Sequence, residues 1–283
     1  MNVQKILGFA AFGLTLLAGA GAALAEGGQP IGDPGIRMPL PYAQRPLTLP
    51  KMTLAPELGL SFTHLSANGF SSPTYVNLEA GAHFGITDDF EVGAIALPIR
   101  FAPNFGYGNP RVEATYRFLK GDFEMGARLG INFITLSGAG GVVMEPGLPM
   151  LFHLGPSARL DLGVFLPLAF GTGGTIAGVP TSASSSTVVG LRVPVRFTYN
   201  IIPEFHIGAE TGLGINDFGH AGSTLYVPLG VVAGYAIPGE KGPLLDLDPY
   251  FGFPLFATPG DNNDKINAGF IQAGLTAKLY LYL

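Results

Sequence analysis

The sequence predicts an all-β protein, a transmembrane antiparallel up-and-down β-barrel of about twelve strands. Apolar and polar residues alternate with a period of two in successive segments from Met52 to the C-terminus, as in strands with one apolar and one polar face. Only 12% of the residues are charged and 47% are hydrophobic, so a soluble fold would expose a large apolar surface to water. After residue 25, no run of about eighteen apolar residues could span a membrane as a helix.

Residues 1–25 have the features of a secretory signal peptide. Lys5 precedes an apolar run that ends at Ala22, and residues 23–25 form a small-x-small cleavage site before Glu26. We therefore expect the peptide to be removed on export; its retention as a membrane anchor is the alternative. The chain contains no cysteine, which excludes a lipoprotein anchor, disulfides and thiolate metal sites.

Residues 26–50 form a separate proline-rich segment with little hydrophobic periodicity. Such a composition favours an extended, polyproline-like chain, which we expect to lie in the periplasm. If this arm folded into a pore, its removal would raise the conductance for all ions.

The barrel is expected to comprise residues 51–283. Its strands are expected to begin near residues 52, 74, 90, 109, 123, 143, 158, 186, 204, 225, 244 and 268. Short connections, such as residues 87–89 and 120–121, alternate with long ones, such as residues 171–185. Short periplasmic turns opposite long external loops are typical of membrane β-barrels, and an even strand number puts both termini on one side.

Prolines interrupt several of these segments: Pro98, Pro149, Pro167, Pro194, Pro228 and Pro254. Proline lacks the backbone donor that a strand ladder needs, and a closed barrel has no edge strand to accommodate it. We therefore expect bulges or a loss of strand pairing near these residues, or one or two misplaced strands.

The last twelve residues, from Gln272 to Leu283, alternate strictly between apolar side chains and polar or aromatic ones. This segment resembles the closing strand of bacterial outer-membrane β-barrels, although Leu283 replaces the usual terminal aromatic residue and Tyr282 stands one place earlier. The resemblance, to small porins and channel-like barrels as a class, implies a location in the outer membrane of a Gram-negative bacterium. It also implies contact with membrane lipid and lipopolysaccharide, and recognition of the last strand by the outer-membrane assembly machinery.

The polar faces of the strands carry most of the charge and supply the candidate pore-lining residues. These are Arg111, Glu113, Arg117, Glu124, Arg128, Arg159, Arg192, Arg196, Glu210, Asp246 and Lys278. Basic residues dominate the fourth, seventh and eighth strands, whereas acidic residues such as Glu57, Glu79 and Glu91 dominate the first three. Opposed basic and acidic walls would place a transverse field across a narrow pore and orient polar solutes in it.

The turn at residues 120–121 predicts a specific register for the two strands that it joins. A two-residue turn places Arg117 opposite Glu124 and Glu113 opposite Arg128. Opposite charges in direct opposition stabilise a strand pair by about 0.2–1 kcal/mol.

No arrangement of residues points to catalysis, so we expect no enzyme and no cofactor. His64 and residues 71–72 would lie near the outer rim, as in barrels that resemble lipases, but no nucleophile motif frames them. His206 and Glu210 share one strand face and are better explained as lumen residues than as metal ligands. Residues 261–264 resemble a calcium site only in composition.

The predicted function is passive diffusion of small polar solutes through a charged, arginine-lined lumen. A net charge of −5 argues against a nucleic-acid partner. The alternative is a non-conducting structural or interaction barrel, filled by its own ion pairs, whose external loops, chiefly residues 171–185, contact partners or surfaces.

Overall fold

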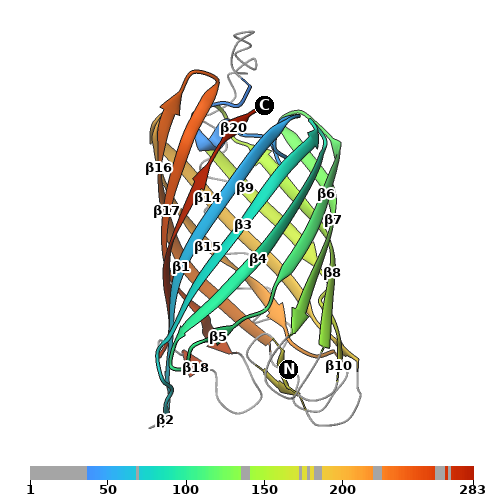
Figure 1. The fold of residues 1–283 in the computed structure, drawn as a ribbon, viewed down its shortest axis with the longest axis vertical. Helices are drawn as coiled ribbons and strands as arrows, with labels where there is room; N and C mark the ends of the chain where they lie inside the picture. Colours follow the sequence, from blue (N-terminus) through green and yellow to red (C-terminus); the bar gives the residue numbers. More distant parts are fainter. Residues whose placement is uncertain are drawn as a thin grey trace, which may run out of the picture.

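The computed structural model describes residues 37–67, 70–134, 141–171, 174–176, 179–181, 187–218, 225–258, 265–266 and 269–283. They form a closed barrel of twelve long antiparallel strands (Figure 1). The long strands are β1 (Thr53–Ala67), β3 (Tyr75–Thr87), β4 (Phe90–Ala102), β6 (Arg111–Leu119), β7 (Phe123–Ile134), β8 (Gly141–His153), β9 (Ala158–Phe165), β14 (Leu191–Ile202), β15 (Phe205–Ile215), β16 (Leu225–Gly239), β17 (Gly242–Thr258) and β19 (Phe270–Leu279). Each pairs with the next long strand, and β19 pairs with β1 to close the barrel. The predicted fold class is therefore confirmed.

The remaining elements are short. They are η2 (Tyr42–Gln44), β2 (Phe70–Ser71), β5 (Gly106–Tyr107), β10 (Leu168–Gly171), β11 (Gly174–Ile176), β12 (Val179–Thr181), β13 (Val188–Val189), β18 (Lys265–Ile266) and β20 (Leu281–Tyr282). Within the described ranges, no helix is long and apolar enough to cross a membrane.

Side-chain alternation separates an apolar outer face from a polar inner face. In β1, Leu58 and Phe62 are 49% and 44% exposed on the outside of the barrel. On the alternate face, Glu57 reaches Lys278 of β19, with 3.1 Å between the carboxylate and the ammonium. The period of two in the sequence thus becomes one face for lipid and one for the lumen.

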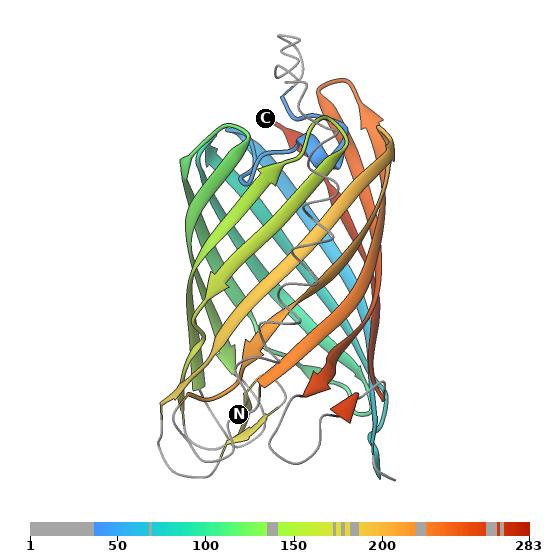
Figure 2. The ribbon, with the colours of Figure 1, turned by 180° about the vertical axis from the view of Figure 1, so that it is seen from behind.

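The two ends of the barrel differ. Short turns join the strands at one end, for example between β3 and β4, β6 and β7, and β16 and β17. β20 and the C-terminus lie at this short-turn end, and so does η2, inside the mouth of the barrel (Figures 1 and 2). In membrane β-barrels the short turns face the periplasm.

Strand pairing is interrupted at the prolines. The ladder between β7 and β8 has a gap at Pro149, that between β9 and β14 at Pro194, and that between β15 and β16 at Pro228. Beside Pro98, β4 is bulged against β3, and Pro167 separates β9 from β10. The expected loss of pairing is confirmed. The strand expected near residue 186 begins later, at Leu191, behind the short β13.

The predicted register of β6 and β7 is wrong. Arg117 pairs with Gly126 rather than with Glu124, and Arg128 pairs with Thr115 rather than with Glu113. The connection between these strands contains three residues rather than two, and the ladder is irregular between Arg117 and Leu119. A longer turn shifts every pair that follows it, which the local pattern alone does not reveal.

Glycines on the inner face make room for large side chains of neighbouring strands. A Cβ atom on each would lie between 2.0 and 2.6 Å from the facing side chain: Gly93 against His83, Gly147 against Phe165, Gly214 against Tyr226, Gly234 against His206, and Gly274 against Tyr250. A twelve-stranded barrel is narrow, so its inward side chains lie along the wall over these glycines. This arrangement accounts for part of the high glycine content.

Candidate functional site

The structure places all the candidate pore-lining residues on the inner wall of the barrel and joins most of them in ion pairs. The pairs are Arg117–Glu124 (2.9 Å), Arg128–Glu113 (2.5 Å), Arg192–Glu145 (2.5 Å), Arg196–Glu210 (2.8 Å), Arg159–Asp161 (2.5 Å) and Lys278–Glu57 (3.1 Å). Arg111 approaches Glu113 at 3.5 Å, and Asp246 binds Arg45. Arg117 and Arg128 thus reach the carboxylates expected from the sequence, but diagonally across the ladder rather than directly.

In all of these arginine–carboxylate pairs except Arg159–Asp161, where the side chains are 7% and 25% exposed, the guanidinium is the more accessible group. The side chain of Arg192 is 46% exposed and that of Glu145 only 11%. Arg111 is 37% exposed beside Glu113 at 13%, and Arg196 is 43% exposed beside Glu210 at 36%. On this part of the inner wall, the arginine side chains are therefore relatively more exposed than the carboxylates that they contact.

Phe165 separates two of the arginines on the inner wall. Its ring is 6% exposed and lies 5.6 Å from the guanidinium carbon of Arg128 and 5.8 Å from that of Arg192. An aromatic face attracts a cation in this geometry, so the ring helps to hold both arginines along the wall.

His83 lies among three carboxylates from three other strands. Its Nδ1 atom lies 2.8 Å from Glu91 and 3.8 Å from Glu113, and its Nε2 atom lies 3.6 Å from Glu57. This cluster joins β1, β3, β4 and β6 across the inner wall. Over the described parts of the chain, no group of three or more His, Asp or Glu residues is arranged to hold a metal ion.

Residues 37–50, which we call the plug segment, lie across the short-turn end inside the barrel (Figure 2). The segment belongs to no sheet. At its start, the Arg37 amide donates to the Lys241 carbonyl at 2.9 Å, and the Arg37 side chain donates to the Leu283 carbonyl at 2.7 Å. At its end, the Thr48 hydroxyl donates to the Asp88 carbonyl at 2.8 Å.

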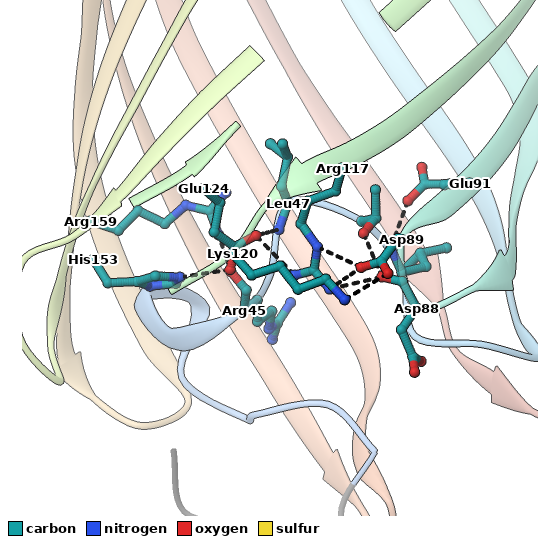
Figure 3. A network of polar contacts seen from close by, with 12 residues as sticks. Arg45, Leu47, Asp88, Asp89, Glu91, Arg117, Lys120, Glu124, His153 and Arg159 are labelled. Atoms are coloured by element: carbon teal, nitrogen blue, oxygen red, sulfur yellow. Dashed lines mark hydrogen bonds and ion pairs between the residues drawn. The ribbon is translucent and has the colours of Figure 1, made fainter. Parts of the chain in front are cut away.

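Polar side chains of the wall bind the backbone of the plug segment (Figure 3). The amides of Leu47 and Leu49 donate to Glu124 at 2.9 Å and Glu91 at 2.7 Å, and that of Ala43 donates to Asn200 at 2.8 Å. In the opposite sense, Arg159 donates to the carbonyls of Tyr42 and Arg45 at 3.2 and 2.9 Å. These contacts satisfy backbone groups that no strand ladder pairs.

Arg45 is the one charged side chain of the plug segment that is buried among the described residues 37–50. It is 4% exposed and forms a bidentate ion pair with Asp246. Tyr280 donates to the same carboxylate at 2.7 Å. Burial alone would lower the pKa of Arg45, but Tyr280 and Asp246 outweigh it, so this pKa lies above its ordinary value and the guanidinium stays charged.

Tyr42 is the aromatic anchor of the plug segment. Its ring stacks on His206 of β15 with centroids 4.5 Å apart, and the guanidinium of Arg159 lies 4.6 Å from the ring centroid on the wall of β9. A second cation, Arg45, lies 5.5 Å from the same centroid. Tyr42 therefore connects the plug segment to β9 and β15, the two strands that flank β14 in the wall.

One network connects the plug segment to two turns (Figure 3). Glu124 accepts bonds from the Leu47 amide and from Arg117, and lies 3.2 Å from His153. Arg117 also contacts Asp89, in the turn between β3 and β4, at 3.0 Å. Lys120, and after it Arg117, hold the pKa of Asp89 below its usual range.

From β14 to β17 the wall has a half-open cavity of about 250 Å³. Its lumen-facing residues include Arg192, Glu210, Tyr226 and Tyr250. Charged and phenolic groups thus line a space large enough for a few water molecules or a small polar solute.

The other residues singled out in the sequence are not brought together. His64 contacts Thr74 at 3.3 Å, while the Ser72 hydroxyl accepts from the Leu65 amide at 3.1 Å. Residues 1–36 and 261–264 lie outside the described residues, as does most of the 171–185 loop.

The docking of the plug segment inside the barrel does not follow from the sequence pattern. Period-two patterns describe strands, and this segment contains none. The signal that was present is Arg45, a charged residue in the middle of a proline-rich stretch, together with the inward Asp246 on a strand near a turn. A buried charge requires a partner, but the partner stands 201 positions away in the chain.

Neither a protein-family model nor a curated protein matches the sequence. The fold is similar to that of the COG4313 outer membrane channel from Pseudomonas putida F1, with 12% identity, a TM-score of 0.54, and coverage of 83% of this chain and 97% of that one. It is also similar to the NanC porin, with 13% identity, a TM-score of 0.53, and coverage of 79% and 100%. The chain therefore has the fold of the bacterial outer-membrane β-barrel class, as its closing strand predicted.

Proposed function

We propose that this chain forms a passive channel for small polar solutes in the outer membrane of a Gram-negative bacterium. The observation that carries this proposal is the accessible charge on the inner wall. Arg192 and Arg196 lie two residues apart on β14, and each is more exposed than its carboxylate partner. Fixed charges in a narrow, low-dielectric passage act on solutes with little screening.

Guanidinium groups favour solutes that carry a carboxylate or a phosphate, because the planar donors match two oxygen atoms at once. The cavity beside Arg192 and Glu210 offers space next to such donors. The similar folds include proteins described as an outer membrane channel and a porin, which favours a channel over other uses of the fold. No catalytic role is part of this proposal.

The second candidate is a non-conducting structural barrel. One observation favours it: the plug segment lies across the short-turn end and is bound there by Glu124, Glu91 and Arg159. In this conformation, a solute that enters from the long-loop end meets the plug segment before it leaves the barrel.

Solute-dependent swelling of vesicles that contain the full chain separates the two candidates. If the chain is a channel, small polar solutes enter the vesicles and swelling is observed. The swelling rate should rise when Arg45→Ala loosens the plug segment, because the anchoring ion pair with Asp246 is lost. Vesicles without protein are the control. No swelling with either form, in protein that migrates as a folded barrel, would support the structural barrel.

We also propose partners for the remaining surfaces. The exposed apolar residues on the outer face are suited to membrane lipid and lipopolysaccharide. The last strand, which ends at Leu283, is suited to recognition by the outer-membrane assembly machinery.

A further inference from the structure

We propose that the short-turn end of this barrel is a binding site for a peptide segment, and that residues 37–50 are its exchangeable resident ligand. The proposal depends on the barrel and not on conduction. It predicts a closed state with the peptide bound and an open state without it.

The barrel does not need the plug segment for its own strand pairing. No residue of the segment belongs to the sheet, and η2 is its only regular element. The ladder between β1 and β19 closes without it. Release of the segment therefore leaves all twelve long strands paired, which is the condition for local opening without global unfolding.

Water can replace the contacts between the wall and the backbone of the plug segment. Glu91, Glu124 and Asn200 accept from backbone amides, and Arg159 donates to backbone carbonyls. Such side chains can be hydrated in the open state, since the lumen is polar. The apolar part is small: Met38 packs with Ala55 and Tyr280, and Leu49 and Tyr282 lie at the edge of this cluster.

The wall leaves room for a peptide backbone at two glycines. A Cβ atom on Gly85 would lie 2.2 Å from the Pro50 carbonyl oxygen, and one on Gly242 would lie 2.4 Å from the Met38 carbonyl oxygen. Gly242 also has a φ of +135°, which favours glycine. Glycine at both positions allows the backbone of the plug segment to approach the wall closely.

Two side chains of the plug segment, each bound by a residue of the wall, give the site its specificity. Tyr42 stacks on His206, and Arg45 binds Asp246 three residues later. The ligand class is therefore a peptide with one 3-10 turn, η2 in this chain, that separates an aromatic residue from an arginine three positions later. Within this chain, the resident ligand occupies the site in cis.

The absence of cysteine from the sequence permits a direct test in the full chain. Ala43 is 0% exposed beneath the plug contacts, so Ala43→Cys should react with a maleimide only when the segment is released. Ala169 is 1% exposed in β10, at the opposite end, so Ala169→Cys is the matched control for access that does not depend on the segment.

Combining Ala43→Cys with Arg45→Ala should raise the labelling rate about ten-fold or more, because Asp246 loses its buried partner. The rate at Ala169→Cys should stay unchanged, and Arg45→Lys should have a smaller effect because the charge remains. A synthetic peptide of residues 37–50, added in excess to the Ala43→Cys chain with Arg45 intact, should also raise the labelling rate, because it occupies the site and keeps the cysteine-bearing segment released. The same peptide with Arg45→Ala should leave the rate unchanged.

Heat-dependent gel migration establishes that each variant is folded, and Tyr42→Ala replaces Arg45→Ala if the latter does not fold. Labelling at position 43 that is equally slow in the parent and the weakened chain would overturn the proposal, as would a labelling rate that the added peptide leaves unchanged. In both cases the segment would be a permanent part of the fold. These readouts require no conductance, so a failure of the channel proposal leaves this test intact.

Discussion

On the inner wall, large side chains pack over glycines, and charged side chains pack against residues of opposite charge. Large side chains such as Tyr226 lie over glycines such as Gly214 of the neighbouring strand, and buried ionised groups such as Arg117 lie against carboxylates. Both arrangements let a narrow barrel contain bulky and charged residues without strain or unpaired charge.

The glycine arrangement predicts a large difference between two alanine substitutions. A Cβ on Gly214 would lie 2.0 Å from the Tyr226 ring, so Gly214→Ala should destabilise the barrel by about 1–3 kcal/mol through overpacking. Gly59→Ala is the matched control, since its nearest neighbour would lie at 3.7 Å. Urea unfolding in lipid vesicles measures both. Equal effects of the two substitutions would contradict this explanation of the glycines.

At the scale of elements, the turn between β6 and β7 is held by charges from both strands and from the neighbouring turn. Arg117 contacts Glu124 and Asp89, and the Arg117 and Glu124 side chains are only 9% and 6% exposed. The pair on β14 and β15, Arg196–Glu210, has side chains that are 43% and 36% exposed. Buried and accessible pairs of the same chemistry should therefore differ in their contribution to stability.

Arg117→Ala should cost about 3–5 kcal/mol of unfolding free energy, because Glu124 keeps a buried charge without this partner. Adding Glu124→Gln should cost less than the sum of the two single changes. In the accessible pair, Arg196→Ala should cost about 1 kcal/mol or less. Chemical unfolding of the singles and doubles gives the coupling energies; strictly additive losses at Arg117 and Glu124 would show that their contact is not formed.

How far the sequence predicts this structure depends on the range of the interaction. Strand positions follow from a period of two, so β4, β7, β9 and β16 begin at the predicted residues. The register of β6 and β7 depends on turn length and on a bulge, which the pattern does not encode. Arg117 and Glu124 still meet, because long side chains reach a diagonal neighbour.

The docking of the plug segment was not predictable in the same way. Its anchors join Arg45 to Asp246 and Tyr42 to His206 across most of the chain. No local periodicity relates such residues, and they meet only after the barrel has closed. The candidate pore-lining residues were named from the sequence, whereas the docking of the plug segment at the short-turn end was not predicted.

At the scale of the whole molecule, a closed ladder and an apolar outer face explain why only 12% of the residues are charged. With every strand paired on both sides, lipid meets side chains and not unpaired backbone groups. Within the described residues, the ion-paired charges lie on the inner wall and at the turns.

This architecture predicts heat-modifiable migration. Unboiled protein in detergent should run at a different position from boiled protein, since the closed ladder resists detergent until it is heated. Circular dichroism of the unboiled form should show strand and little helix. Identical migration before and after boiling, or a predominantly helical spectrum, would be incompatible with the barrel.

The central claim, a conducting lumen whose ion preference is set by β14, is tested most directly by reversal potentials in a salt gradient. Single-channel recordings of the full chain should show discrete conductance steps, larger in the Arg45→Ala form. Replacing both Arg192 and Arg196 by Gln removes two positive charges but keeps polarity, so the reversal potential should move toward cation preference. An absence of discrete conductance in both the parent and the Arg45→Ala form, or a reversal potential that the double replacement leaves unchanged, would contradict the account.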